Sequence, residues 1–279
     1  MGRVFSRPEI IERLSLSIAN NQPIIAANAS VGISAKCAGL AGADLIIYST
    51  MGKSRLKGFP TRIIGDFGGD LSMKIQRDMW QVVENTPLIS GLDANDTDSL
   101  DHDRLLDRFV AAGISGVCNL PTVQMYCDTF RIRATKTFHG FNSELDLIRK
   151  AHMRNLYSVG FVFYAEDALA MMEAGADMIV ATCGATQGGM SGYAHMDVDL
   201  AIERIAKVVT AVKRADPGVL CLGHGGPFND PKSTRMLYDQ TDCDGYFGGS
   251  SIERIPIETA VKSVIEDYKK PVIAELKKK

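Results

Sequence analysis

Eight short apolar runs, each followed by a stretch with helical spacing, constrain the fold of this chain more than any other feature. None of the runs alternates regularly between polar and apolar residues, which is typical of strands buried on both faces in a parallel sheet. They span residues 23–28, 44–49, 87–92, 114–119, 156–163, 177–182, 219–222 and 243–247. The helical patterns span 32–40, 71–84, 101–112, 143–154, 165–174 and 198–214, with two more beginning at Asp230 and near Ile257. Alternating strands and helices over 279 residues predict one domain, 1–279, folded as a single (β/α)8 TIM barrel.

A repeated junction supports the barrel. Residues 40–46 (L-A-G-A-D-L-I) resemble residues 173–179 (E-A-G-A-D-M-I), and 112–115 (A-G-I-S) is a looser third copy. Each copy puts a glycine where a helix ends, a position that often takes positive φ, directly before an apolar strand. A doubly wound sheet is the alternative, but no G-x-G-x-x-G follows the first strand. Residues 7–20 predict an extra N-terminal helix that closes the bottom of the barrel.

Composition and charge narrow the classes of partner. The net charge of −2 provides no general basic field, so we expect no nucleic-acid partner. No apolar run approaches the length of a membrane span, so we expect no membrane partner. None of the six cysteines forms a C-x-x-C pair, and most lie in apolar segments, so we expect free thiols in a reducing cytoplasm. They are Cys37, Cys118, Cys127, Cys183, Cys221 and Cys243.

Two glycine-rich corners follow the last two strands. Residues 223–227 read G-H-G-G-P and residues 246–251 read Y-F-G-G-S-S. Glycine lets backbone N–H groups approach an anion, and a following helix adds the positive end of its dipole. In (β/α)8 barrels these two loops often bind phosphate. We therefore expect an anion between Gly225, Gly226, Gly249 and Ser250; the alternative is two tight turns whose glycines only relieve backbone strain.

The carboxyl ends of the strands predict a polar ring around the barrel mouth. The ring comprises Asn28, Ser49, Asp93, Asn119, Tyr164, Thr182, His224 and Ser250. Asn28, Ser49, Asn119 and Thr182 are candidate substrate-binding residues. His224 is the sharpest catalytic candidate, as a general acid or base, unless its ring is simply satisfied by nearby backbone. Asp93 is a second catalytic candidate, as a base or a metal ligand, although D-A-N-D also suits a turn.

The segment 50–70 is long, basic and rich in glycine, which predicts a mobile lid. Its Arg55 is a candidate anion ligand, and Arg131 and Arg133 on a second long connection are weaker ones. No lysine lies within a predicted strand, which argues against a Schiff-base aldolase. No motif specifies a metal, so the cofactor is unknown and a divalent ion is left open.

Several motifs together resemble the phosphoenolpyruvate hydrolase-like family, also called the TIM-barrel signal transduction protein family. They are I-S-A-K-C (33–37), G-A-D-L-I (42–46), P-T-V (121–123), E-D-A (166–168), G-G (188–189), H-G-G-P (224–227) and G-S-S-I-E-R (249–254). The resemblance extends over nearly the whole chain. It implies a TIM barrel akin to indole-glycerol-phosphate synthase and the phosphoenolpyruvate-handling barrels, assembled as a homo-oligomer.

These observations predict a hydrolase or lyase whose substrate is a small anion with a carboxylate, phosphate or enol group. Gly226, Gly249 and Ser250 would hold the anion, and His224 would transfer a proton with help from Asp93. Two alternatives stay open. One is a non-catalytic ligand-sensing or interaction module on the same barrel, and the other is a metal-dependent C–C lyase.

Overall fold

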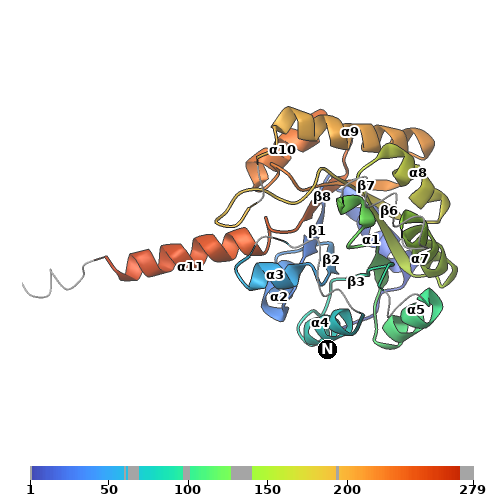
Figure 1. Cartoon of the computed structure of the whole chain (residues 1–279), viewed down its shortest axis with the longest axis horizontal. Helices are drawn as coiled ribbons and strands as arrows, with labels where there is room; N and C mark the ends of the chain where they lie inside the picture. The colour runs from blue at the N-terminus through green and yellow to red at the C-terminus, as the bar shows by residue number, and fades with distance from the viewer. Residues whose placement is uncertain are drawn as a thin grey trace, which may run out of the picture.

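A computed structural model describes residues 2–59, 61, 69–96, 101–126, 140–192 and 195–270. Its eight strands form a closed barrel in the order of the chain, and β8 pairs in parallel with β1, which confirms the predicted TIM barrel (Figure 1). The strands are β1 (Ile24–Asn28), β2 (Leu45–Tyr48), β3 (Leu88–Gly91), β4 (Gly116–Cys118), β5 (Tyr157–Val162), β6 (Met178–Thr182), β7 (Leu220–His224) and β8 (Gly245–Gly248).

Helices surround the barrel. They are α1 (Arg7–Ala19), α2 (Gly32–Leu40), α3 (Gly52–Leu56), α4 (Gly69–Trp80), α5 (His102–Ala111), α7 (Phe141–Met153), α8 (Ala165–Glu173), α9 (Val198–Ala215), α10 (Pro231–Gln240) and α11 (Arg254–Tyr268), with a 3₁₀ turn η2 at Val123–Met125. Aspartates begin several of them: Asp101, Asp197 and Asp230 each accept a hydrogen bond from a backbone N–H of the first turn. The predicted N-terminal helix is present as α1, which buries Ile10 and Leu14 beneath the barrel.

The repeated glycine–aspartate junction has a structural reason. Gly42, Gly113 and Gly175 all adopt positive φ at the ends of their helices, as the sequence predicted. The carboxylate of Asp44 accepts a hydrogen bond from the N–H of Ile25 on the preceding strand, at 2.8 Å. Asp177 bonds the N–H of Ser158 in the same way, at 2.9 Å. Each aspartate therefore ties the start of one strand to the start of the one before it.

The structure corrects several predicted boundaries. β7 extends to His224, since this residue still pairs with Thr182 and Phe247 of the neighbouring strands. β8 covers 245–248 instead of 243–247, and α11 begins at Arg254, before Ile257. Within the segment 50–70, for which the sequence predicts a mobile lid, Gly52–Leu56 form the short helix α3 with buried Ser54 and Arg55; the mobility of the segment stays a prediction. Residues 60 and 62–68 of that segment lie outside the described residues, as do Arg131 and Arg133.

Two apolar layers hold the barrel together. Inward-facing strand side chains such as Leu45, Val159 and Leu222 fill its interior, and a second layer lies between the sheet and the outer helices. No helix among the described residues is long and apolar enough to cross a membrane. The five described cysteines are free thiols.

Candidate functional site

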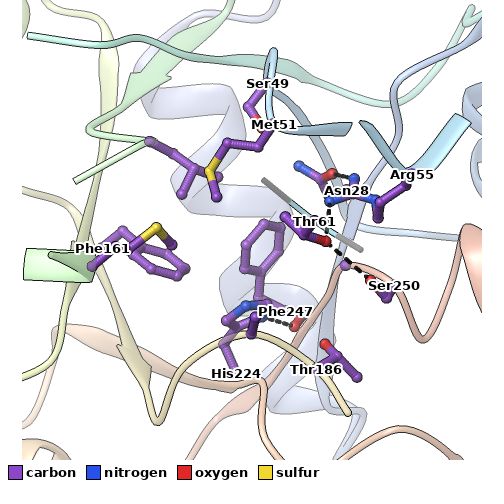
Figure 2. Close-up of a pocket in the computed structure, with 14 residues that line it drawn as sticks. Asn28, Ser49, Met51, Arg55, Thr61, Phe161, Thr186, His224, Phe247 and Ser250 are labelled. Atoms are coloured by element: carbon purple, nitrogen blue, oxygen red, sulfur yellow. Dashed lines mark hydrogen bonds between the residues drawn. The ribbon is translucent and has the colours of Figure 1, made fainter. Parts of the chain in front are cut away.

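A cavity lined by both polar and apolar residues lies at the mouth of the barrel, where the carboxyl ends of the strands converge (Figure 2). Its volume is about 30 Å³, close to the space needed by one small guest such as water. Six of the predicted site residues line it: Asn28, Ser49, Arg55, His224, Gly249 and Ser250. The lining that the sequence analysis missed is Met51, Thr61, Leu120, Met125, Phe161, Ala185, Thr186 and Phe247.

His224 is held in one tautomer. Its Nδ1 lies 2.8 Å from the carbonyl oxygen of Phe247, and because a carbonyl only accepts, Nδ1 carries the proton. Burial lowers the pKa of His224 to about 4, so the ring is neutral at pH 7. Nε2 makes no hydrogen bond within the described part of the chain. The ring thus presents an unprotonated nitrogen at a cavity wall made with Phe161 and Phe247.

The cavity wall carries two serine hydroxyls, and two backbone amides beside it have no acceptor among the described residues. Ser49 is 1% exposed, and none of the described residues hydrogen-bonds its Oγ. The Oγ of Ser250 lies 3.4 Å from that of Thr61. No described residue accepts a hydrogen bond from the N–H of Ser250 or Ser251, which begin the turn that leads into α11. Free donors ahead of a helix N-terminus favour an anion.

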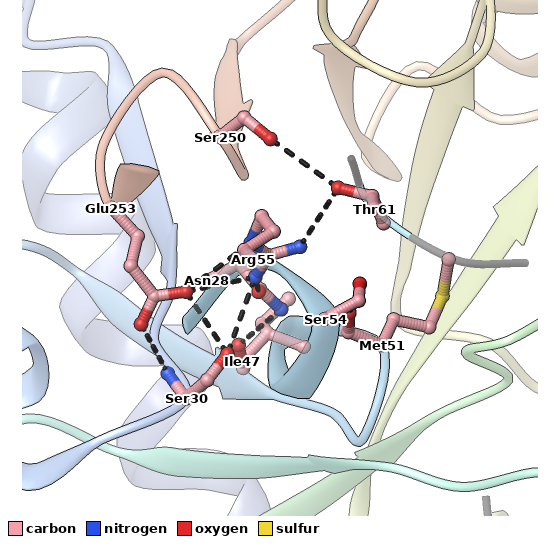
Figure 3. Close-up of polar contacts among 9 residues, drawn as sticks. All are labelled: Asn28, Ser30, Ile47, Met51, Ser54, Arg55, Thr61, Ser250 and Glu253. Atoms are coloured by element: carbon pink, nitrogen blue, oxygen red, sulfur yellow. Dashed lines mark hydrogen bonds and ion pairs between the residues drawn. The ribbon is translucent and has the colours of Figure 1, made fainter. Parts of the chain in front are cut away.

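Arg55 organises the wall between β1 and β8 (Figure 3). Its guanidinium donates to Asn28 Oδ1, to Ser30 Oγ at 3.3 Å and to Glu253 Oε2 at 3.0 Å. Glu253, 1% exposed, also accepts from the N–H of Ser30 at 2.7 Å. Burial lowers the pKa of Arg55, while the adjacent Glu253 carboxylate opposes this effect. The positive charge is therefore neutralised within the protein, and Arg55 mainly positions the polar groups beside the cavity.

Two predicted residues near β3 and β4 are not part of the cavity lining. Asn119 donates to Glu144 at 2.6 Å and to the carbonyl of Phe161 at 3.0 Å, so its amide joins β4 to β5. Asp93 accepts from the N–H of Asn95 at 2.9 Å, within a turn. Burial raises the pKa of Glu144, which lies behind this region, to about 8.

Thr182, Gly225 and Gly226 belong to the contact between the β6 and β7 loops. Thr182 Oγ1 accepts from the N–H of Gly184 at 3.0 Å, and the N–H of Gly226 donates to the Gly184 carbonyl at 3.3 Å. A side chain at Gly225 would overlap that same carbonyl. The N–H of Gly226 is therefore already used within the protein.

The described lining of the cavity does not offer the donors that a hard divalent cation prefers. Mg²⁺ usually binds one or two carboxylates, and none of the described lining residues carries one. The described residues also contain no group of three or more His, Cys, Asp or Glu side chains arranged to hold a metal.

Fold and site together define a TIM-barrel protein with a small pocket of mixed polar and apolar lining at its carboxyl-terminal mouth, where barrel proteins place their ligands. The chain belongs to the phosphoenolpyruvate hydrolase-like family, whose pattern matches residues 9–270.

Curated relatives are longer than this chain. The ToMV susceptible protein tm-1(GCR26) of Solanum lycopersicum is 31% identical over 270 residues, which cover 93% of this chain and 35% of that protein. A putative transcriptional regulatory protein, y4pA, of Sinorhizobium fredii (strain NBRC 101917 / NGR234) is 27% identical, over 95% of this chain and 44% of that protein. This chain thus spans about a third of the tomato protein.

Solved structures share the fold at low identity. Phosphoenolpyruvate phosphomutase from Streptomyces platensis subsp. rosaceus superposes with a TM-score of 0.60 at 15% identity, covering 94% of this chain and 90% of that one. A phosphonopyruvate hydrolase complexed with oxalate and Mg²⁺ gives 0.57 at 17%, covering 96% and 87%. 2,3-Dimethylmalate lyase gives 0.59 at 14%, covering 94% and 88%.

Some of the missed residues left a signal in the sequence. Glu253 is part of the S-S-I-E-R motif. A carboxylate next to a glycine-rich corner indicates that a basic side chain lies nearby to pair with it. Phe161 left no such signal, because it lies inside the unbroken apolar run of β5, where no residue is marked by its neighbours as facing the cavity.

Proposed function

We propose that this protein is a hydrolase or lyase that binds a small anionic substrate at the barrel mouth and uses His224 as a proton acceptor. One observation carries the proposal. The imidazole of His224 is buried and neutral, and its Nδ1–H donates to the carbonyl of Phe247. Its Nε2 is therefore unprotonated and can only accept a proton. Such a nitrogen suits the deprotonation of a water molecule or of a substrate hydroxyl group.

The groups around Nε2 fit an anion. The N–H groups of Ser250 and Ser251 and the hydroxyls of Ser49 and Ser250 would donate to its oxygen atoms. A bound anion would also stabilise the imidazolium that forms when Nε2 takes a proton. The cavity is smaller than an anion such as oxalate, so binding requires the lining to open, and Met51 and Met125 are its most adaptable side chains.

The structural neighbours support this class of reaction. Phosphonopyruvate hydrolase and oxaloacetate acetylhydrolase, both solved with oxalate, and 2,3-dimethylmalate lyase share the barrel. The Mg²⁺ named with one of them is not carried over, because the described lining lacks a carboxylate. We further propose a cytoplasmic location, since the described cysteines are free.

His224→Gln tests the proposal. Oxalate binding is measured by calorimetry, and turnover is measured with phosphonopyruvate and oxaloacetate. We expect the wild type to convert at least one of them, and the variant to keep oxalate affinity within about threefold while turnover falls at least about 100-fold. Unchanged turnover in the variant would contradict the role of His224.

A ligand-sensing module is the second candidate. The small volume of the cavity and the name of the Sinorhizobium relative, a putative transcriptional regulatory protein, favour it. In the same experiment a sensor would bind oxalate with no turnover of either compound by the wild type.

A further inference from the structure

The polar and the apolar side chains of the mouth cavity come from different parts of the barrel. Strands β6, β7, β8, β1 and β2 are consecutive around the closed sheet, and each strand or the loop after it contributes a polar side chain to the lining. In that order they are Thr186, His224, Ser250, Asn28 and Ser49, which we call the polar wall. Among the described lining residues, β4, β5 and the loops after them contribute only Leu120, Met125 and Phe161, which we call the apolar wall. Figure 2 shows Phe161 on the left of the cavity and Asn28 and Ser250 on the right.

Thr186 extends the polar wall to the loop after β6. The residue is 4% exposed and lines the cavity, and its hydroxyl has no hydrogen-bond partner in the described part of the chain. A hydroxyl that is buried without a partner costs free energy, so a ligand oxygen at this place would be stabilised. We therefore expect the oxygen-rich end of a ligand between Thr186 and the corner at Ser250.

The ring of His224 favours a hydroxyl group beside that end. Its Nε2 carries no proton, because Nδ1 donates to the carbonyl of Phe247 at 2.8 Å, so Nε2 accepts a hydrogen bond from an O–H group. The corner after β8 adjoins this ring, since a Cβ on Gly249 would lie 3.5 Å from its Cε1. A carboxylate at the corner and a hydroxyl at Nε2 therefore fit neighbouring carbon atoms of one ligand.

The apolar wall does not suit a second charged group. Leu120 and Phe161 are 4% and 0% exposed and belong to the apolar cluster inside the barrel, against which Met125 packs. The N–H of Phe161 offers no donor, because it already donates to Asn119 at 2.6 Å. An ionised carboxylate at this wall would lose its water and gain no donor in return, whereas burial of an alkyl group is favourable.

Met125 is the part of the apolar wall that can make room. Its side chain is partly exposed, and methionine is unbranched and adapts its shape to a neighbour. The turn η2 that carries it is held in place, because the N–H of Val123 donates to Glu144 at 2.7 Å. A rotation of the Met125 side chain would therefore enlarge the cavity on its apolar side without movement of the backbone.

We propose that the ligand of this site is a short 2-hydroxy carboxylate with one anionic end and one alkyl end. Its carboxylate meets Thr186 and Ser250, its hydroxyl donates to Nε2 of His224, and its alkyl group packs against the apolar wall. A second carboxylate in place of the alkyl group is disfavoured. The inference rests on the proposed function in that it assigns the ligand to the same cavity, but it concerns binding and not turnover.

Calorimetry with two matched probes tests the inference. Racemic 2-hydroxybutyrate and racemic malate share the carboxylate, the hydroxyl and the length of the carbon chain, but malate has a carboxylate where 2-hydroxybutyrate has its terminal methyl group. We expect the wild type to bind 2-hydroxybutyrate at least about 10-fold more tightly than malate. Equal affinities, tighter binding of malate, or no measurable binding of 2-hydroxybutyrate would overturn the inference.

Substitutions on the two walls locate the two ends of the ligand. Met125→Gln puts an amide on the apolar wall and should reduce the preference for 2-hydroxybutyrate at least about fivefold, whereas Met125→Leu, the matched apolar control, should keep it. Thr186→Val removes a hydroxyl with little change of shape, so it should weaken both probes about 3- to 10-fold and leave the preference unchanged. Circular dichroism checks that each variant is folded. An unchanged preference in Met125→Gln, or a changed one in Thr186→Val, would contradict the assigned orientation.

Failure of the proposed function would be a separate result. Unchanged turnover in His224→Gln would remove the catalytic role of this residue and leave the order of the two affinities as it is. Tighter binding of malate, together with the expected loss of turnover in His224→Gln, would overturn this inference alone.

Discussion

His224 should make the stability of this protein depend on pH in a defined direction. Its folded pKa is lowered to about 4 from an ordinary 6.5, so the unfolded chain binds the proton more tightly. The stabilisation is therefore complete above pH 6.5 and is lost as the pH falls toward 4, by about 3 kcal/mol over that range. Urea denaturation at pH 7 and pH 4 measures it. His224→Gln should remove about this much of the pH dependence, and an equal dependence in both proteins would contradict the assigned neutral state.

The Ser49 hydroxyl should lower the stability of the free protein and strengthen the binding of a ligand. Its buried hydroxyl makes no hydrogen bond within the described chain, and leaving such a group unsatisfied costs about 1–3 kcal/mol. Ser49→Ala should therefore leave the free energy of unfolding unchanged or raise it, while weakening oxalate binding about 5- to 10-fold. Urea denaturation measures the stability and calorimetry the affinity. Ser90→Ala, which removes a buried hydroxyl that lies beside Tyr48 on the neighbouring strand and outside the cavity lining, is the matched control for binding. Unchanged oxalate affinity would show that this hydroxyl does not meet the ligand.

Among the secondary-structure elements, the glycine-rich loops after β7 and after β8 have different structural roles. Gly225 has a φ of +85°, and a Cβ there would overlap the Gly184 carbonyl on the β6 loop. A Cβ on Gly249 would meet only the His224 ring, at 3.5 Å, an ordinary contact. The corner after β7 therefore packs two loops together, and the corner after β8 borders the cavity.

Alanine substitutions at Gly225 and Gly249 should distinguish the packing role of the first loop from the binding role of the second. Gly225→Ala should destabilise the fold by about 2–4 kcal/mol through strain and overlap. Gly249→Ala should cost less than about 1 kcal/mol and instead weaken oxalate binding, because its methyl group narrows the cavity. Thermal denaturation and calorimetry on both variants measure this. Equal stability of the two variants would contradict the distinction.

At the scale of the whole molecule, a buried ion pair spans the closure of the barrel, because Arg55 follows β2 and Glu253 follows β8. Glu253→Gln would leave the guanidinium of Arg55 buried without its counter-charge, so it should lower the free energy of unfolding by about 3–5 kcal/mol. Glu203→Gln, which removes one partner of an exposed pair with Lys207, is the control and should leave the stability nearly unchanged, because solvent screens that pair. Urea denaturation measures both variants, and equal losses would contradict the structural importance of the buried pair.

The sequence by itself determined the barrel and several details of it. Buried parallel strands and amphipathic helices leave local periodicities, and the G-A-D junction fixed both a positive φ at Gly42 and Gly175 and the start of the next strand. The sequence also predicted that His224 lies at the carboxyl end of a strand. The barrel topology then places it at the mouth, because all strands end there. These features depend on residues close to one another in the chain.

Only the tertiary structure decided which strand-end residues meet. Asn28, Arg55 and Glu253 are brought together across the closure of β8 on β1, and the opposite charges of Arg55 and Glu253 cancel there. No local sequence pattern shows this contact. The tautomer of His224 depends on a carbonyl 23 residues away, and the use of Gly226 depends on the neighbouring β6 loop. The sequence likewise predicted a helix near Ile257 without its direction. That direction is set by contacts of Arg254 and Glu258 with residues far along the chain, because orientation is a property of packing and not of periodicity.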